Sequence, residues 1–428
     1  MLVDQSKIKK IEAVSDRGIV FAFCALIFCL PASIALVESF AGLAIFCYIV
    51  KKISQIIAYR ICPAPVPNAL NWPLGILTLA TFISVLHSQY LGVSLFAFLA
   101  KFGEGVFLYF SFIEAFTTPR RIKLFLGAFL FSALLAALSG FIQHYTHRDF
   151  LRQHPMNDGR VTSAFRHANG FGAYLILVFG FVSGLFLLPF SGFKKPLLIK
   201  GTLGVLLFLV LACLDWTYSR GAWSGFLVLL FFMAWMDYKK IIYAGIMLLI
   251  FIFVFIPSLH KERSVSLFTD NINQNKSEIV PQVALSQTAG SGRYDYWKKA
   301  VSVIDGDPVW GTGLNTYTRI IKRDDLGIGY GYAHNCYLQM AAETGLVGLG
   351  CFLWMLSVLF VQGVRRSWQM EDAFLKAVLQ GALCGLLGLL VHSFFDTILY
   401  AVQLDNLMWV IMGFIVAVMQ IKTFRQVS

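Results

Sequence analysis

Charged residues are scarce in this chain. Asp, Glu, Lys and Arg make up only 14% of its 428 residues, whereas 58% are hydrophobic. A soluble globular domain carries charge on roughly a quarter of its residues. The deficit, together with a mean hydropathy of +0.71, excludes a soluble protein, because most of the surface must face lipid. We therefore predict an all-α polytopic membrane protein.

Patterns typical of disulfides and metal sites are also missing. None of the eight cysteines forms a Cys-x-x-Cys pair or a Cys/His cluster with metal-ligand spacing, so we predict neither a disulfide framework nor a metal site. Asp305-Gly306-Asp307 has the Asp-x-Asp form that holds a metal and a nucleotide in many glycosyltransferases. The Pro308 that follows favours a turn instead. No matched halves indicate the inverted repeats of a transporter.

Apolar runs long enough to cross a bilayer recur about twelve times. They lie near residues 18–36, 38–50, 72–86, 93–116, 123–143, 170–190, 197–216, 222–236, 241–257, 346–361, 377–399 and 407–421. Basic pairs such as Lys51/Lys52 and Lys239/Lys240 fall on every second connection, on the side of the N-terminal lysines. By the positive-inside rule that side is the cytoplasm, so both termini are expected there. The net charge of +12 then reflects topology rather than a nucleic-acid partner.

Two connections on the opposite side are longer than a turn, and they divide the chain. Residues 1–257 are predicted to hold spans one to nine, with an outer loop near 144–169. Residues 258–345 are predicted to form a partly helical periplasmic loop between spans nine and ten. Residues 346–428 hold the last three spans and a short cytoplasmic tail. Loops as long as 258–345 are usually functional.

Two arginines stand out on the predicted outer side. Arg220 lies in the tight turn Ser219-Arg220-Gly221, and Arg293 opens the helical part of the long loop. The plain alternatives are an arginine that reaches the headgroups for Arg220 and a solvated helix residue for Arg293. A guanidinium binds phosphate in a bidentate manner and keeps its charge, so two arginines that converge here would suit a lipid pyrophosphate.

A histidine and an asparagine complete the candidate polar set. His334 lies where a helix is expected to begin, and Gly345 where that helix is expected to end. The helix dipole disfavours the imidazolium at such a position, and a neutral imidazole can act as general base; the alternative is a capping or packing histidine. Asn169 follows Arg160 and Arg166 at the entrance of a span, where it could simply be the N-cap. A second pair, His392 and Asp396, is spaced for a proton relay or for lining an outer pocket.

Four segments, in this order, resemble the O-antigen ligase and polymerase superfamily of bacterial envelope glycan enzymes. They are residues 159–174, with a Gly-Arg…Asn-x-Phe-x-x-Tyr pattern, Ser219-Arg220-Gly221, residues 291–317, with Arg…Trp…Asp-x-Pro…Gly-x-Gly, and residues 334–348, with His-Asn-x-Tyr-Leu…Glu-x-Gly-Leu-x-Gly. One departure is Ala168, where the family often has Pro before the Asn.

The resemblance implies a GT-C-like glycosyltransferase of the bacterial inner membrane that acts on its periplasmic face without metal, nucleotide or other cofactor. The implied donor is an undecaprenyl-pyrophosphate-linked glycan, and the acceptor is lipid A–core. By the resemblance, Arg220 and Arg293 bind the pyrophosphate, and His334 activates the acceptor hydroxyl for inversion at the anomeric carbon. The predicted substrate-binding residues are Arg160, Arg166, Asn169, Trp297, Asn335 and Tyr337.

Other members of the same superfamily remain open as alternatives. A polymerase transfers the glycan to another repeat unit, and a protein O-oligosaccharyltransferase transfers it to Ser or Thr. The single long loop before the tenth span favours a ligase, and protein-modifying members commonly carry a further soluble domain. A glycolipid transporter is the alternative of a different class. A transporter should place ionisable residues near the bilayer midplane, and apart from Lys101 and Glu104 we expect few there.

Overall fold

The computed structural model describes residues 5–60, 64–156, 158–188, 196–250, 252, 291–321 and 331–421. Within these ranges the chain is almost entirely helical, and no strand is formed beyond one isolated bridge between Arg148 and Pro155. The prediction of an all-α membrane protein is therefore confirmed. The predicted loop 258–345 is described only from residue 291, apart from the further gap 322–330.

The helices follow the predicted spans closely. Before the long loop they are α1 (Gln5–Cys29), α2 (Ile34–Tyr59), α3 (Asn71–His87), α4 (Leu91–Ala97), α5 (Gly103–Ala115), α6 (Pro119–Thr146), α7 (Ala168–Phe186), α8 (Pro196–Trp216) and α9 (Arg220–Met236). After it come α11 (Ser291–Gly306), α12 (Tyr317–Ile320), α13 (Cys336–Gln369), α14 (Ala373–His392) and α15 (Val402–Gln420). A π-helical turn, Phe98–Phe102, joins α4 to α5.

Eight helices in the described residues are long and apolar enough to cross a membrane, and three shorter apolar helices lie beside them. The shorter ones are Asn71–His87, Arg220–Met236 and Ile241–Ile250. Length and composition thus confirm a multi-pass protein. The exact count of twelve spans stays a prediction.

The boundary between the first two predicted spans was wrong. The sequence placed it near residue 37, but α1 ends at Cys29 and α2 begins at Ile34. Pro31 lies in this break and has no backbone N–H for a helical hydrogen bond. Ser33 then caps α2, because its side chain accepts a hydrogen bond from the backbone N–H of Leu36 at 3.3 Å. Because apolar side chains lie on both sides of the turn, the sequence pattern did not reveal the helix end at Pro31 and the cap at Ser33.

Glycines bring three helices together at the centre of the bundle. A Cβ on Gly180 of α7 would lie 2.6 Å from the carbonyl oxygen of Gly381 in α14. A Cβ on Gly225 of α9 would lie 2.3 Å from the carbonyl oxygen of Gly388 in α14. Small residues at such contacts let the backbones of membrane helices approach closely. α14 is therefore clamped between α7 and α9, and the ends of these three helices reach the candidate site.

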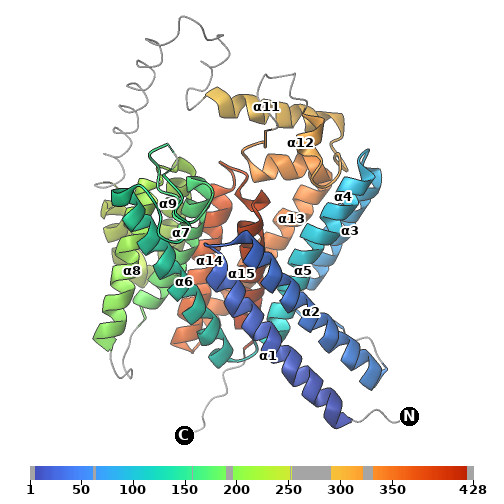
Figure 1. The fold of residues 1–428 in the computed structure, drawn as a ribbon, viewed down its shortest axis with the longest axis horizontal. Helices are drawn as coiled ribbons and strands as arrows, with labels where there is room; N and C mark the ends of the chain where they lie inside the picture. Colours follow the sequence, from blue (N-terminus) through green and yellow to red (C-terminus); the bar gives the residue numbers. More distant parts are fainter. Residues whose placement is uncertain are drawn as a thin grey trace, which may run out of the picture.

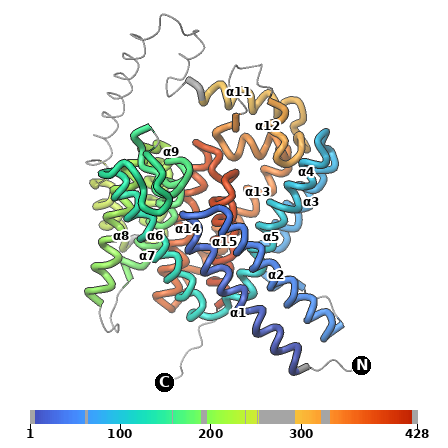
Figure 2. The backbone as a smooth tube through the Cα atoms, viewed as in Figure 1, coloured from blue at the N-terminus to red at the C-terminus, as the bar shows by residue number. Residues whose placement is uncertain are grey.

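The two ends of the bundle differ. α11 and α12 lie at one end, and the beginning of α1 lies at the other (Figure 1). The backbone trace shows α6 to α9 on one side of α14 and α15, and α3, α5 and α13 on the other side (Figure 2). At the end away from α11, Lys51 pairs with Asp16 at 2.8 Å and Lys52 pairs with Glu114 at 2.6 Å. These ion pairs join α1, α2 and α5 where the sequence predicted cytoplasmic charge.

The short helical module of α11 and α12 is fixed to the bundle at a helix break. Gly345 has a φ of 71° and interrupts α13, which confirms the prediction that the first helical segment ends there. The break releases backbone carbonyls, so that Ala342 accepts from Thr312 N at 3.0 Å and Glu343 accepts from Gly313 N at 2.8 Å. The segment after α11 is thereby held against α13.

Asp307 supplies a second anchor for this module. Its Oδ2 lies 2.6 Å from Nε2 of His87, at the end of α3. Asp305 and Gly306 belong to α11, so the turn predicted at Asp305–Pro308 begins only at Asp307. No group of three or more His, Cys, Asp or Glu suited to a metal ion occurs in the part of the chain that the structure describes.

Candidate active site

His334 lies directly before the N-terminus of α13. The helix begins at Cys336, two residues later than predicted, and Asn335 is its N-cap. The Asn335 side-chain oxygen accepts from Tyr337 N at 2.9 Å and from Leu338 N at 3.0 Å. His334 itself has a φ of 49°, a backbone conformation that is uncommon for a residue other than glycine. The cap therefore fixes the direction in which the imidazole leaves the chain.

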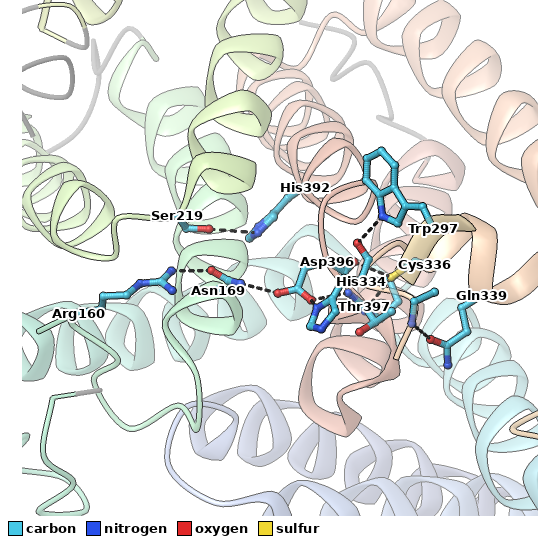
Figure 3. A network of polar contacts seen from close by, with 12 residues as sticks. Arg160, Asn169, Ser219, Trp297, His334, Cys336, Gln339, His392, Asp396 and Thr397 are labelled. Carbon is cyan, nitrogen blue, oxygen red and sulfur yellow. Dashed lines mark hydrogen bonds and ion pairs between the residues drawn. The ribbon is translucent and has the colours of Figure 1, made fainter. Parts of the chain in front are cut away.

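The imidazole of His334 is held by Asp396, which follows α14. Its Nδ1 lies 2.9 Å from Oδ1 of Asp396, and the same oxygen accepts from Thr397 N at 2.8 Å. Figure 3 shows this carboxylate between His334 and Asn169. An Nδ1–H that donates to a carboxylate leaves Nε2 as the acceptor nitrogen of a neutral ring. This is the tautomer that a general base needs.

The hydrogen-bonded chain continues from Asp396 to the loop before α7. Asn169 donates a short hydrogen bond from Nδ2 to Oδ2 of Asp396 and accepts from Nη2 of Arg160 at 2.7 Å. Arg160 also donates from Nε to the carbonyl oxygen of Thr217 at 2.7 Å. Asn169 lies in the first turn of α7, whose N-cap is His167, so the alternative of Asn169 as the N-cap was wrong.

The Ser219-Arg220-Gly221 turn reaches the same place from α9. Ser219 is the N-cap of α9, and its Oγ lies 3.3 Å from Nε2 of the buried His392. A Cβ on Gly221 would lie 2.6 Å from Cδ2 of His392. Only glycine can therefore follow Arg220 at this contact. Arg220 itself is exposed at the start of α9, between two residues that touch His392.

α11 covers this site from the side of the long loop. Trp297 donates from Nε1 to the carbonyl oxygen of His334 at 3.5 Å, and its ring lies 5.6 Å from that of Phe394. The Tyr296 ring lies 5.1 Å from the His334 imidazole. Arg293, one turn earlier in α11, is close enough to act electrostatically on His392, as Arg160 is. Two separate parts of the chain thus contribute an arginine whose charge acts on His392.

The carboxylate of Asp396 stays ionised in this setting. Burial by itself would raise the pKa of Asp396, but hydrogen bonds from His334 and Asn169 and the charge of His334 outweigh it, so the pKa lies well below its usual range. Burial lowers the pKa of the nearby His167, and the charges of Arg166 and Arg160 lower it further. The site therefore combines one fixed negative charge with a surrounding positive potential.

The predicted site residues fall into two groups. Five meet around His392 and Asp396, directly or through a neighbour: Arg160, Asn169, Arg293, Trp297 and His334. Arg220 is exposed beside Ser219, which contacts His392, and Asn335 caps α13. Tyr337 instead connects α13 to α14, because its hydroxyl donates to the carbonyl oxygen of Leu390 at 2.7 Å. Arg166 is exposed, and its charge acts on His167. Their part in catalysis or binding stays a prediction.

Asp396 is the residue that the sequence did not assign to the site. It was considered only together with His392, one helical turn away, as a proton relay or as part of the lining of an outer pocket. The structure pairs it instead with His334, and His392 contacts Ser219. The available signal was an acidic residue at the predicted outer end of a span, where a carboxylate without a function is costly. Nothing in the spacing indicated which histidine it would hold.

Comparison with known families bears directly on this geometry. Residues 203–353 match the family model described as O-Antigen ligase. The resemblance to the O-antigen ligase superfamily is confirmed. The matched range contains Arg220, Arg293, His334 and Gly345, but it ends before Asp396. Members of this family are glycosyltransferase-type enzymes of envelope glycan biosynthesis. A search of curated proteins found no match.

Proposed function

We propose that this O-antigen ligase superfamily protein transfers an undecaprenyl-pyrophosphate-linked glycan to lipid A–core at the periplasmic face of the inner membrane. The observation that carries the proposal is the contact between His334 and Asp396, close to His392, on which the charges of Arg160 and Arg293 act. Transfer from a pyrophosphate donor requires a base for the acceptor hydroxyl and cationic groups for the leaving pyrophosphate. The family match supports the same class of reaction.

The reaction follows from the two halves of the site. The acceptor hydroxyl gives its proton to Nε2 of His334 as its oxygen attacks the anomeric carbon of the donor. The bond from that carbon to the pyrophosphate oxygen breaks on the opposite face, so the configuration inverts. Arg220 and Arg293 bind the leaving pyrophosphate and stabilise its charge as it departs. Asp396 accepts the Nδ1 proton, which directs Nε2 to the acceptor hydroxyl, and it stabilises the imidazolium that the step forms.

The membrane orientation is part of the proposal. Lys51, Lys52 and Arg121 gather with Asp16 and Glu114 at the end away from α11. By the positive-inside rule this end faces the cytoplasm, which places α11, His334 and both arginines on the periplasmic side. In this proposal the donor lies in the periplasmic leaflet, with its glycan on the periplasmic side, when the transfer takes place.

Transfer by purified protein tests the mechanism. Wild-type protein in lipid nanodiscs, given the lipid-linked glycan and lipid A–core in the presence of a chelator, should form the long-chain product. His334→Ala should lose about 10²- to 10⁴-fold in kcat while it still binds donor. Arg220→Ala and Arg293→Ala should also weaken donor binding. Wild-type turnover by His334→Ala would exclude the base, and strict dependence on a metal ion would exclude the proposed chemistry.

A deletion strain separates the ligase from the polymerase. For a ligase, all long-chain lipopolysaccharide should disappear while carrier-linked polymer accumulates. For a polymerase, the core should instead carry a single repeat unit, and that result would contradict the proposed acceptor.

A further inference from the structure

A cavity on the side of His334 away from Arg160 has its own polar lining. It lies between α2, α3, α5, α13 and α15, and its ionisable lining residues are Glu38, Lys101, Glu104, Glu343 and Asp405. Acidic groups outnumber the single cationic one, which reverses the balance at the arginines. Ionisable groups within membrane spans are costly and usually serve a function.

Polar groups from several elements line this cavity. Asn406 is 3% exposed, and its Nδ2 donates to Oε1 of Glu104 at 3.0 Å. Lys101 reaches Oδ1 of Asn315 at 3.2 Å, which extends the polar lining to the segment between α11 and α12. Carboxylate and amide groups of this kind can exchange hydrogen bonds with the hydroxyl groups of a ligand.

An aromatic wall faces these polar groups. The Trp409 indole packs on Gly105, where a Cβ would lie 2.2 Å from the indole nitrogen, and it meets the Phe102 ring edge-on at 5.8 Å. Both rings line the cavity. Carboxylate and amide groups that bind hydroxyls, opposite a flat aromatic surface that packs on C–H groups, are the two features by which proteins hold a sugar ring.

The cavity adjoins the candidate active site through shared residues. Cys336 lines the cavity, and its Sγ lies 3.2 Å from the carbonyl oxygen of Asp396. Tyr400, four residues after Asp396, lines it as well and donates to Glu343 at 3.2 Å. In Figure 3 Arg160 and Gln339 lie on opposite sides of His334, and Glu343 follows Gln339 by one helical turn. The cavity thus begins beside the contact between His334 and Asp396, on the side of His334 where Gln339 lies.

We propose that this cavity binds a saccharide ring of the acceptor, one that carries hydroxyl or amino groups and no phosphate. The inference rests on the proposed function and assigns the acceptor to a binding site separate from that of the donor. None of the described residues that line the cavity is an arginine, so this lining lacks the guanidinium groups that bind a pyrophosphate. The two substrates are therefore assigned to separate places beside His334, as transfer between them requires.

Steady-state transfer by protein in nanodiscs tests this placement. The double variant Glu104→Gln/Asp405→Asn keeps the shape of the cavity and removes two charged acceptors. It should raise the KM for lipid A–core about tenfold, since hydrogen bonds to charged groups are lost, and leave the KM for the donor unchanged. Glu12→Gln in α1 is the matched control and should change neither KM. An unchanged acceptor KM in the double variant, or a rise confined to the donor KM, overturns the proposal.

A second measurement uses the wild-type protein and does not depend on variants that fold. Dicyclohexylcarbodiimide modifies carboxyl groups in apolar surroundings, and peptide mass spectrometry measures its reaction at Glu104 and Asp405. Soluble, dephosphorylated core oligosaccharide should slow that reaction, and inorganic pyrophosphate should not. No protection by the oligosaccharide, or equal protection by pyrophosphate, contradicts the proposal. If the wild-type protein forms no product but the oligosaccharide protects, the proposed function fails while the saccharide site stands.

Discussion

At the scale of single residues, the contact between Asp396 and His334 decides how the site works. A histidine at the start of a helix has two ring nitrogens, and its chemistry depends on which of them is held. The carboxylate occupies Nδ1 at 2.9 Å, so Nε2 is left to face a substrate. Asn169 and Arg160 extend the same chain, which joins the base to the loop before α7.

Asp396→Asn should lower kcat about 10²- to 10⁴-fold with little change in the KM for the donor. The amide cannot fix the Nδ1–H tautomer or stabilise the imidazolium. Single-turnover and steady-state transfer with purified protein measure the effect. Asp237→Asn, after the end of α9 that lies away from the site, is an isosteric control, and its kcat should stay near that of the wild type. Equal kcat values for Asp396→Asn and wild type would show that the carboxylate has no part in the step.

Acid should destabilise the protein partly through Asp396. Its pKa in the folded protein lies below the ordinary value, which is about 4 in unfolded chains. The ionised carboxylate therefore stabilises the fold above that ordinary value, and the contribution is lost as the pH falls toward the depressed pKa. Between about pH 6 and pH 3, Tm should fall more for wild type than for Asp396→Asn. Thermal unfolding in detergent at each pH measures this, and parallel curves would contradict it.

At the scale of helices, the break in α13 positions the module that covers the site. Gly345 is non-helical, and the carbonyls before it accept hydrogen bonds from the segment after α11. Glu343 adds side-chain contacts to the same segment, since it accepts from Asn315 N at 2.9 Å. The Glu-x-Gly pattern is thus explained by the docking of one element on another.

Gly345→Ala should separate this module from the bundle. A Cβ there would lie 2.0 Å from the carbonyl oxygen of Val309, and the positive φ is strained for alanine. We expect a loss of about 1–3 kcal/mol of stability and a large loss of transfer. Gly350→Ala is the matched control, because a Cβ at Gly350 meets nothing within 4 Å. Tm and transfer activity are compared for both variants; the same behaviour in the two would refute the docking role.

At the scale of the whole molecule, charged groups are distributed unevenly over the bundle. Ion pairs gather at the end of the bundle away from α11, and His334 lies beside Trp297 of α11. Within the site end, α7 and α9 bring positive groups from one side, and the acidic cavity lies on the other. One central helix, α14, separates them and ends in His392.

Cysteine labelling tests the proposed orientation. Ser302→Cys in α11 should react with a membrane-impermeant maleimide in intact spheroplasts. Gln369→Cys, at the end of α13 beyond Arg365 and Arg366, should react only after permeabilisation. Both positions are exposed. The reverse pattern would place the site in the cytoplasm and exclude the proposed donor leaflet.

The sequence by itself determined the class, the approximate spans and most of the site. The scarcity of charged residues and the long apolar runs require burial in lipid. Both features depend on composition and local sequence pattern, so they can be recognised without the tertiary structure. Motifs such as Ser219-Arg220-Gly221 and His334-Asn335 were readable because each needs its residue types at adjacent positions, for a helix cap or a close approach. The break at Pro31 was missed because the apolar residues around it outweighed the end signal.

Only the tertiary structure decided which distant groups meet. Asp396 pairs with His334 rather than with its helical neighbour His392, because the packing of α14 against α7 and α9 turns the two residues toward different partners. The acidic cavity likewise draws Glu38, Lys101, Glu104 and Asp405 from three separate parts of the chain. Pairings of this kind depend on how each helix is rotated about its axis and shifted along it relative to its neighbours. Glycine contacts between the backbones set this arrangement, and a local pattern of side chains does not reveal it.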